Sequence, residues 1–168
     1  VPEYIRLIAG GRFADAYMVN WKSNVFPGIL GRTCDRPCEP ACRRGRVEEN
    51  QVARPEPLAI CRLKRVTADF KEDIRPRMPR RRVPMNGKRV ACIGAGPASL
   101  TVARDLAPLG YEVIVFDQDP KPGGMIWTQI PRFRLPESVI DEEVGHVLNL
   151  GVEFKQRKID SMKALMKE

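Results

Sequence analysis

The residues best suited to chemistry in this sequence are three cysteines that recur at four-residue steps. Cys34, Cys38 and Cys42 lie in the run GRTCDRPCEPACRRGRV, and Cys61 follows nineteen residues later. Thiolates at helical or turn spacing can converge on one cubane iron–sulfur cluster. Structural zinc sites usually carry cysteine pairs separated by two residues, so the three-residue gaps favour iron–sulfur and leave zinc as the alternative.

A glycine-rich turn in the second half of the chain predicts a dinucleotide site. It reads Gly94-Ala95-Gly96-Pro97-Ala98-Ser99 and follows the apolar run RVACI. Gly94 allows the tight turn and Gly96 lets the backbone approach a pyrophosphate, while Ser99 stands where a third tiny residue is usual. The N-terminus of the helix that follows offers free N–H groups to a phosphate.

An acidic residue and a second glycine pair indicate which dinucleotide binds. Asp117 ends the next β-rich run, YEVIVFD, and Gly123-Gly124 follow six residues later. A carboxylate there accepts hydrogen bonds from a ribose diol and disfavours a 2′-phosphate, and therefore NADP. The second glycine pair lets a loop fold over a phosphate or a flavin. Together, these residues favour FAD over NAD at this site.

Hydrophobic patterning predicts the elements that position these residues. Two short helices are expected within residues 2–22, and a helix in PLAICRLKRVTADF would place Cys61 in its first turn, where the helix dipole favours an anionic cluster. The second half alternates strand, helix and strand, which is a βαβ unit. We therefore expect an α + α/β chain: a helical domain over residues 1–73, an Arg/Pro-rich linker over 74–87 and an incomplete Rossmann-like, doubly wound domain over 88–168.

The net positive charge lies in the first half of the chain. Residues 1–86 carry the entire net charge of +8, whereas residues 87–168 are balanced. Such an excess fits nucleic acid or a bound anion, and an iron–sulfur cluster held by four thiolates is an anion. No aromatic residues interleave with the linker arginines for base stacking, so we expect no nucleic-acid partner.

Composition and sequence patterns limit the possible cellular location and type of chemistry. No apolar run approaches the roughly 20 residues of a membrane span, and no secretory leader is recognisable, so we expect a cytoplasmic protein without a membrane partner. Cys92 lies in an apolar run and is expected to be a buried core thiol. His146 is the one histidine, and no Ser/His/Asp arrangement accompanies it, so nothing supports hydrolase chemistry.

Several stretches resemble one family. VPEYIRLIAGGRF, NVFPGILGRTCDRPCEPACRRGRV, AICRLKR, GKRVACIGAGPASL, GYEVIVFDQDPKPGGM and IPRFRLP together resemble the small (β) subunit of NADPH-dependent glutamate synthase and related iron–sulfur flavoproteins. The likeness covers nearly the whole chain. It implies a helical iron–sulfur domain followed by an FAD-binding domain. It further implies 4Fe–4S ligands at Cys34, Cys38, Cys42 and Cys61, FAD contacts at Gly94, Gly96, Asp117, Gly123 and Gly124, and neighbours of the flavin at Met125, Ile130 and Arg134.

The resemblance also implies an activity for the intact protein. Electrons would pass from NAD(P)H, bound by a domain absent from this chain, through FAD to iron–sulfur clusters and a larger catalytic subunit. The chain would then be an internal piece of an oxidoreductase and inactive alone. Gln129 stands where the family usually has glycine. Two other functions stay open: a docking module stabilised by zinc or a cluster, and a basic nucleic-acid-binding protein.

Overall fold

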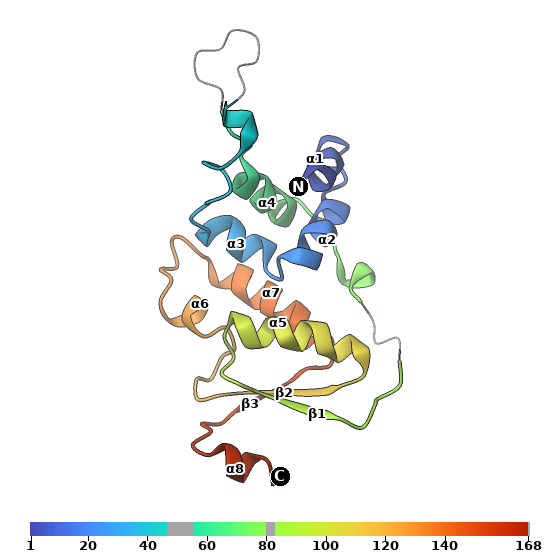
Figure 1. Ribbon diagram of the computed structural model, residues 1–168, viewed down its shortest axis with the longest axis vertical. Coiled ribbons are helices and arrows are strands. Elements are labelled where there is room, and N and C mark those ends of the chain that lie inside the picture. Colours follow the sequence, from blue (N-terminus) through green and yellow to red (C-terminus); the bar gives the residue numbers. More distant parts are fainter. Residues whose placement is uncertain (47–55, 80–82, 168) are drawn as a thin grey trace. The chain divides into compact units, whose positions relative to one another are not determined.

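The chain folds as two compact units. The computed structural model describes residues 1–46, 56–79 and 83–167, and it divides into Val1–Ile74 and Arg75–Glu168 (Figure 1). Within the segment expected to be a linker, Ile74 is buried and ends the first unit. The backbone N–H of Asn86 donates to the carbonyl of Gly110 at 2.9 Å, so the end of that segment packs onto the second unit.

The first unit is helical. Its elements are α1 (Pro2–Ala9), α2 (Phe13–Ser23), α3 (Pro27–Thr33), a 3₁₀ turn η1 (Arg43–Arg46) and α4 (Ile60–Asp69). Proline occupies the first helical position of α1 and α3, where its fixed φ suits the helix and its missing N–H costs nothing. Gly11, with φ of +72°, turns the chain between α1 and α2.

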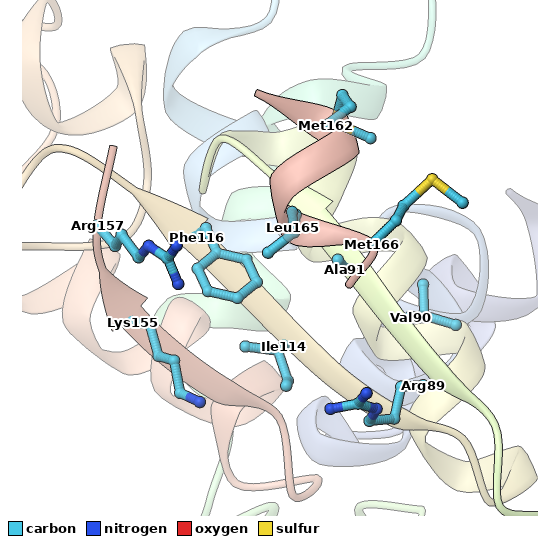
Figure 2. Close-up of a pocket in the computed structure, with 10 residues that line it drawn as sticks. All are labelled: Arg89, Val90, Ala91, Ile114, Phe116, Lys155, Arg157, Met162, Leu165 and Met166. Carbon is cyan, nitrogen blue, oxygen red and sulfur yellow. The ribbon is translucent and has the colours of Figure 1, made fainter. Parts of the chain in front are cut away.

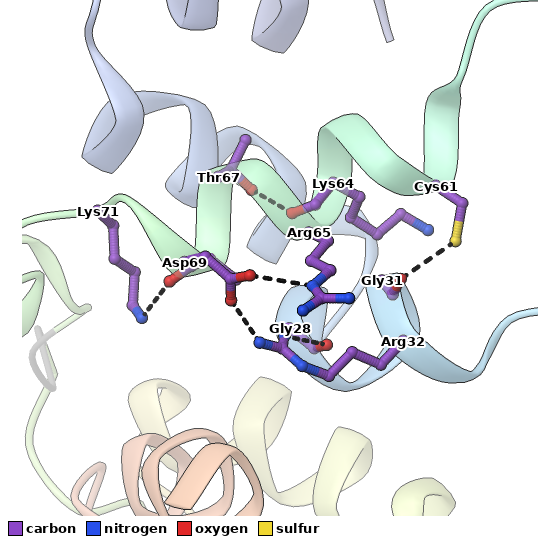
Figure 3. Close-up of polar contacts among 10 residues, drawn as sticks. Gly28, Gly31, Arg32, Cys61, Lys64, Arg65, Thr67, Asp69 and Lys71 are labelled. Atoms are coloured by element: carbon purple, nitrogen blue, oxygen red, sulfur yellow. Dashed lines mark hydrogen bonds and ion pairs between the residues drawn. The ribbon is translucent and has the colours of Figure 1, made fainter. Parts of the chain in front are cut away.

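Helices α3 and α4 approach each other closely in this unit. Gly31 is required there, because a Cβ atom on it would lie 2.8 Å from the Cα of Arg65. Asp69 of α4 links the two helices, because it accepts hydrogen bonds from Arg32 Nη2 of α3 at 2.5 Å and from Arg65 Nε of α4 at 3.0 Å (Figure 3). Buried Tyr17 fills the interior, as its helical spacing predicts.

The second unit is built on a parallel sheet. Its strands are β1 (Arg89–Ile93), β2 (Glu112–Asp117) and β3 (Glu153–Gln156), in the order β1-β2-β3. Its helices are η2 (Arg75–Arg77), α5 (Pro97–Leu106), η3 (Ala107–Leu109), α6 (Met125–Thr128), α7 (Glu137–Leu148) and α8 (Met162–Leu165). None of the helices described in either unit is both long enough and apolar enough to cross a membrane.

The crossover helices cover one face of the sheet. Helix α5 connects β1 to β2, α7 lies between β2 and β3 in sequence, and both pack on the same side, whereas α8 lies beyond the opposite face (Figure 1). Strand β2 is central and buried through Val113, Ile114, Val115 and Phe116. This arrangement confirms the expected α + α/β class, with a Rossmann-like parallel sheet in the second unit.

A cavity of about 480 Å³ opens between the sheet and α8 (Figure 2). Its floor is apolar, its rim carries three cationic side chains, and its lining is Arg89, Val90, Ala91, Ile114, Phe116, Lys155, Arg157, Met162, Leu165 and Met166. None of these is a residue that the sequence predicts to bind a cofactor. The predicted nucleotide site therefore lies elsewhere on the unit, at the ends of the strands.

Candidate cluster and nucleotide sites

The dinucleotide turn connects β1 to α5. Gly94 adopts φ of +87°, which favours glycine, and its N–H donates to the carbonyl of Phe116 at 2.7 Å. Gly96 is the N-cap of α5 and Pro97 its first residue. A Cβ atom built on Gly94 or Gly96 would meet nothing within 4 Å, so the space beside both glycines is open. An open cradle ahead of a helix N-terminus is what a pyrophosphate needs.

Asp117 ties the end of β2 to this turn. Its Oδ2 accepts a hydrogen bond from the Ala95 N–H at 2.5 Å, and its Oδ1 accepts one from the Asp119 N–H at 3.0 Å. A carboxylate has about four acceptor sites, so these two bonds leave capacity for a ribose hydroxyl. Asp117 thus has a structural task besides the predicted recognition of ribose.

The second glycine pair lies directly against the first turn. The Gly123 N–H donates to the Ala95 carbonyl at 2.7 Å. Gly124, with φ of +55°, approaches so closely that a Cβ atom on it would lie 3.0 Å from the Cα of Gly96. The structure therefore brings Gly94, Gly96, Gly123 and Gly124 together at the carboxyl end of β1. No role for Ala95 is predicted from the sequence, although its position between Gly94 and Gly96 in the motif could have indicated one.

The remaining predicted flavin neighbours follow this pair in sequence. Met125 opens α6 and is 64% exposed, whereas Ile130 is half-buried. Arg134 is exposed, and its N–H closes a turn on the Pro131 carbonyl at 3.0 Å. In the first turn of α5, Ala98 is exposed and Ser99 is half-buried. These side chains border the glycine turns in sequence without sharing in the contacts described above.

The first three cysteines lie on a series of turns that continues from α3. Cys34 is the C-cap of α3, and its Sγ accepts a hydrogen bond from the Arg36 N–H at 3.4 Å. Arg36 has φ of +61°, which is uncommon for a residue with a side chain. The Glu39 N–H donates to the Arg36 carbonyl, and the Cys42 N–H donates to the Glu39 carbonyl, both at 3.0 Å. Cys38 is exposed between them.

Cys61 lies in the first turn of α4, as predicted, and is 3% exposed. Its Sγ donates to the carbonyl of Leu30 at 3.5 Å, in the last turn of α3. It also donates to the carbonyl of Gly31 in the same turn, at 3.6 Å (Figure 3). Its N–H donates to Glu39 Oε1 at 3.0 Å. The Glu39 side chain therefore fastens the cysteine-bearing turns to the start of α4.

Three of the cysteines influence the pKa values of Cys61 and Tyr4. Burial raises the pKa of Cys61, and the nearby Cys34 raises it further. Burial also raises the pKa of Tyr4 to about 12, with Cys38 and Cys61 as additional causes. The Tyr4 hydroxyl donates to the carbonyl of Ile60 at 3.2 Å, which holds the phenol beside the start of α4.

The fourth sulfur lies near the approach to α4. Backbone hydrogen bonds from Leu58 and Arg44 lower the pKa of Cys42. In the described parts of the chain, however, no three His, Cys, Asp or Glu side chains are close enough together to hold a metal ion. The four thiols fit an iron–sulfur cluster by their chemistry, since thiolates are the usual ligands of such clusters. Ligation requires the turns that carry Cys34, Cys38 and Cys42 to draw closer to Cys61.

Comparison with known proteins assigns both units. The family model described as dihydropyrimidine dehydrogenase domain II, 4Fe-4S cluster, matches residues 1–75. The model described as an NAD(P)-binding Rossmann-like domain matches residues 92–152. The first match ends one residue after the helical unit, and the second runs from the end of β1 through α5, β2 and α7.

Curated relatives match along most of the chain. The NADP(+)-dependent formate dehydrogenase subunit beta of Moorella thermoacetica is 37% identical, with 90% of this chain and 24% of the relative covered. PreT, a subunit of NAD-dependent dihydropyrimidine dehydrogenase from Salmonella typhimurium, is 35% identical, with 91% and 36% covered. The glutamate synthase [NADPH] small chain of Azospirillum brasilense is 35% identical, with 90% and 31% covered. Most of the chain is therefore similar to one part of proteins named as glutamate synthase small chains and related oxidoreductase subunits.

These matches confirm the resemblance to glutamate synthase small chains seen in the sequence. The chain spans only about a quarter to a third of the length of these relatives. Its relatives are named as subunits or chains of oxidoreductases, and the two matched domains are described as a 4Fe–4S cluster domain and an NAD(P)-binding domain.

Proposed function

We propose that the chain is the cluster- and flavin-binding part of an NAD(P)H-dependent oxidoreductase subunit. The observation that carries the proposal is the meeting of two glycine turns, with open space beside Gly94 and Gly96, in a chain whose first 75 residues match a 4Fe–4S domain.

The proposed FAD site uses backbone more than side chains. The open turn at Gly94 and Gly96 and the N-terminus of α5 would accept the pyrophosphate, and Asp117 would accept a ribose hydroxyl. Gly124 would keep a second stretch of backbone against Gly96 and so narrow the cradle. Other residues proposed to border FAD are Pro97, Ala98, Ser99, Gly123, Met125, Ile130 and Arg134.

The proposed cluster ligands are Cys34, Cys38, Cys42 and Cys61. Glu39 would hold Cys61 in register with the other three, because its carboxylate accepts the Cys61 N–H. When bound, FAD takes up the two electrons of a hydride and the cluster carries single electrons. NAD(P)H would bind a domain outside this chain.

Partner and location belong to the same proposal. Relatives are named as subunits and chains of larger enzymes, which supports delivery of electrons to a larger catalytic subunit. A cytoplasmic location suits five free cysteines, because thiols stay reduced there.

The test is anaerobic purification of the protein at its natural full length, with iron, sulfide and flavin assays. We expect FAD and acid-labile sulfide, flavin lost in Asp117→Ala and cluster absorbance lost in Cys61→Ser. Cys92→Ser is the matched control, since Cys92 is a buried thiol in β1 with no proposed ligand role. A colourless protein with stoichiometric zinc, or Cys61→Ser that loses only subunit docking while electrons still flow, would replace this proposal by the docking module.

A further inference from the structure

A tryptophan beside the second glycine turn lies under two cationic side chains. The Lys121 Nζ is 4.2 Å from the centroid of the Trp127 ring, and the Arg132 Cζ is 4.8 Å from it. Arg132 also donates through Nη2 to the backbone carbonyl of Trp127, and its Nε lies 3.8 Å from Glu137 Oε1. Cations attracted to the face of an indole restrict how it can turn, so both side chains help to hold this ring in place.

The indole is packed against the glycine that touches the dinucleotide turn. A Cβ atom on Gly123 would lie 2.5 Å from Trp127 Cδ1, so the ring occupies the space that a side chain would take. The Gly123 N–H donates to the carbonyl of Ala95 at 2.7 Å. A continuous series of contacts therefore runs from the two cations through the indole and Gly123 to the Ala95 carbonyl.

The turn held in this way is costly to order. Gly123 and Gly124 have φ of +134° and +55°, and glycine loses more conformational freedom than any other residue when one conformation is fixed. Helix α6 has only four residues, too few to be stable alone. Anchoring by a large aromatic side chain offsets this cost, and Trp127 is the large aromatic that the four residues of α6 provide.

We propose that Trp127 is a positioning residue for FAD. It acts through Gly123 and Gly124, because it presses the second glycine turn onto the dinucleotide turn before the ligand arrives. The inference depends on the FAD site proposed above. Preorganisation of a binding loop strengthens affinity by removing the cost of ordering it on binding, so the effect belongs to FAD affinity and to the rate of FAD release.

The test is titration of the natural full-length apoprotein with FAD, followed by flavin fluorescence. We expect Trp127→Leu to raise the FAD dissociation constant about tenfold, mainly through faster release, and Trp127→Phe to recover most of the affinity because it keeps an aromatic face. The control is Phe133→Leu, which removes an aromatic side chain that is 92% exposed in the same segment and should leave the dissociation constant unchanged.

A second pair of variants separates the cations from general packing. Lys121→Met removes one cation over the ring and should weaken FAD binding about two- to threefold. Lys158→Met is the control, because Lys158 is paired with Asp160 at 3.1 Å and touches neither glycine turn. Melting temperatures of all variants are measured in parallel, so that a loss of fold is not mistaken for a loss of affinity.

Three outcomes decide the matter. Wild-type FAD binding with unchanged affinity in a folded Trp127→Leu would overturn the positioning role and leave the FAD site standing. If Trp127→Leu does not fold, wild-type affinity in Lys121→Met would overturn it, because the cation that holds the indole over Gly123 would then not matter. A wild-type protein that does not bind FAD would overturn the proposed site and this inference together.

Discussion

The crossing of α3 and α4 gives the sharpest prediction about stability. Gly31→Ala introduces a Cβ atom 2.8 Å from Arg65 Cα and 2.9 Å from Arg65 N and Cβ. Such atoms normally stay about 3.5–4.0 Å apart, so the helices must separate by several tenths of an ångström or more. Two of the three clashing atoms are backbone atoms, which cannot move by changing a rotamer. The substitution therefore acts on the whole crossing.

The magnitude follows from two opposed effects. Overpacking costs typically about 1–3 kcal/mol, and a clash with backbone belongs at the upper end of that range. Replacing a helical glycine by alanine returns about 1 kcal/mol of helix propensity. We expect a net loss of about 2 kcal/mol, which lowers the melting temperature of a unit of this size by roughly 8–16 °C.

The assay is urea unfolding of Gly31→Ala, followed by far-ultraviolet circular dichroism and by hydrogen exchange of the amides in α3 and α4. Gly10→Ala is the matched control in the same unit, because a Cβ atom there meets its nearest neighbour at 3.6 Å and φ is −88°. A Gly31→Ala protein as stable as Gly10→Ala would refute the close crossing. The same change should also speed alkylation of Cys61, whose sulfur donates to the Gly31 carbonyl.

Three further predictions concern charge, reactivity and close approach. Partial burial alone would raise the pKa of Asp69, but hydrogen bonds from two guanidinium groups lower this pKa below 3.8 overall. The contribution of Asp69 to stability is therefore present above pH 4 and is lost as pH falls through the lowered pKa. When the free energy of unfolding is measured against pH in acid, this step should be absent in Asp69→Asn. Alkylation of the apoprotein at neutral pH, followed by mass spectrometry, should modify Cys42 before Cys61. Backbone hydrogen bonds lower the pKa of Cys42, whereas burial raises the pKa of Cys61. Equal alkylation rates at the two cysteines would contradict the buried position of Cys61. Gly124→Ala should weaken FAD binding at least tenfold, because its φ of +55° and its Cβ 3.0 Å from Gly96 both penalise a side chain; unchanged affinity would separate this glycine from the site.

The sequence is most informative where a residue type has one physical use. Gly94 and Gly96 at a strand–helix junction, with Asp117 closing the next strand, predict the βαβ unit and the position of its turn, because few other arrangements need those residues at that spacing. The first-turn position of Cys61 follows equally from the helical pattern around it. These predictions depend on local sequence, which is why they hold.

Contacts between segments that are distant in the sequence cannot be predicted from local sequence patterns. Nothing near Gly31 indicates that Arg65 crosses it, and nothing near Gly123 indicates that an indole takes the place of its side chain. The second hydrogen-bonding task of Asp117, toward Ala95, likewise appears only once the turn is folded. Such features need the register of one segment against another, and composition and periodicity leave that register open.

The position of Cys61 sets a physical condition on cluster assembly. Its S–H donates to two carbonyls at the end of α3, and a thiolate ligand has no proton to donate. Deprotonation would therefore leave a negative sulfur facing two carbonyl oxygens, so the Cys61 side chain must turn away or the end of α3 must move. Cys34 is the C-cap of α3, so any movement of that end carries Cys34 with it. If the end of α3 is what moves, ligation by Cys61 and by Cys34 would be one coupled event, and a variant that fixes the end of α3 should block both.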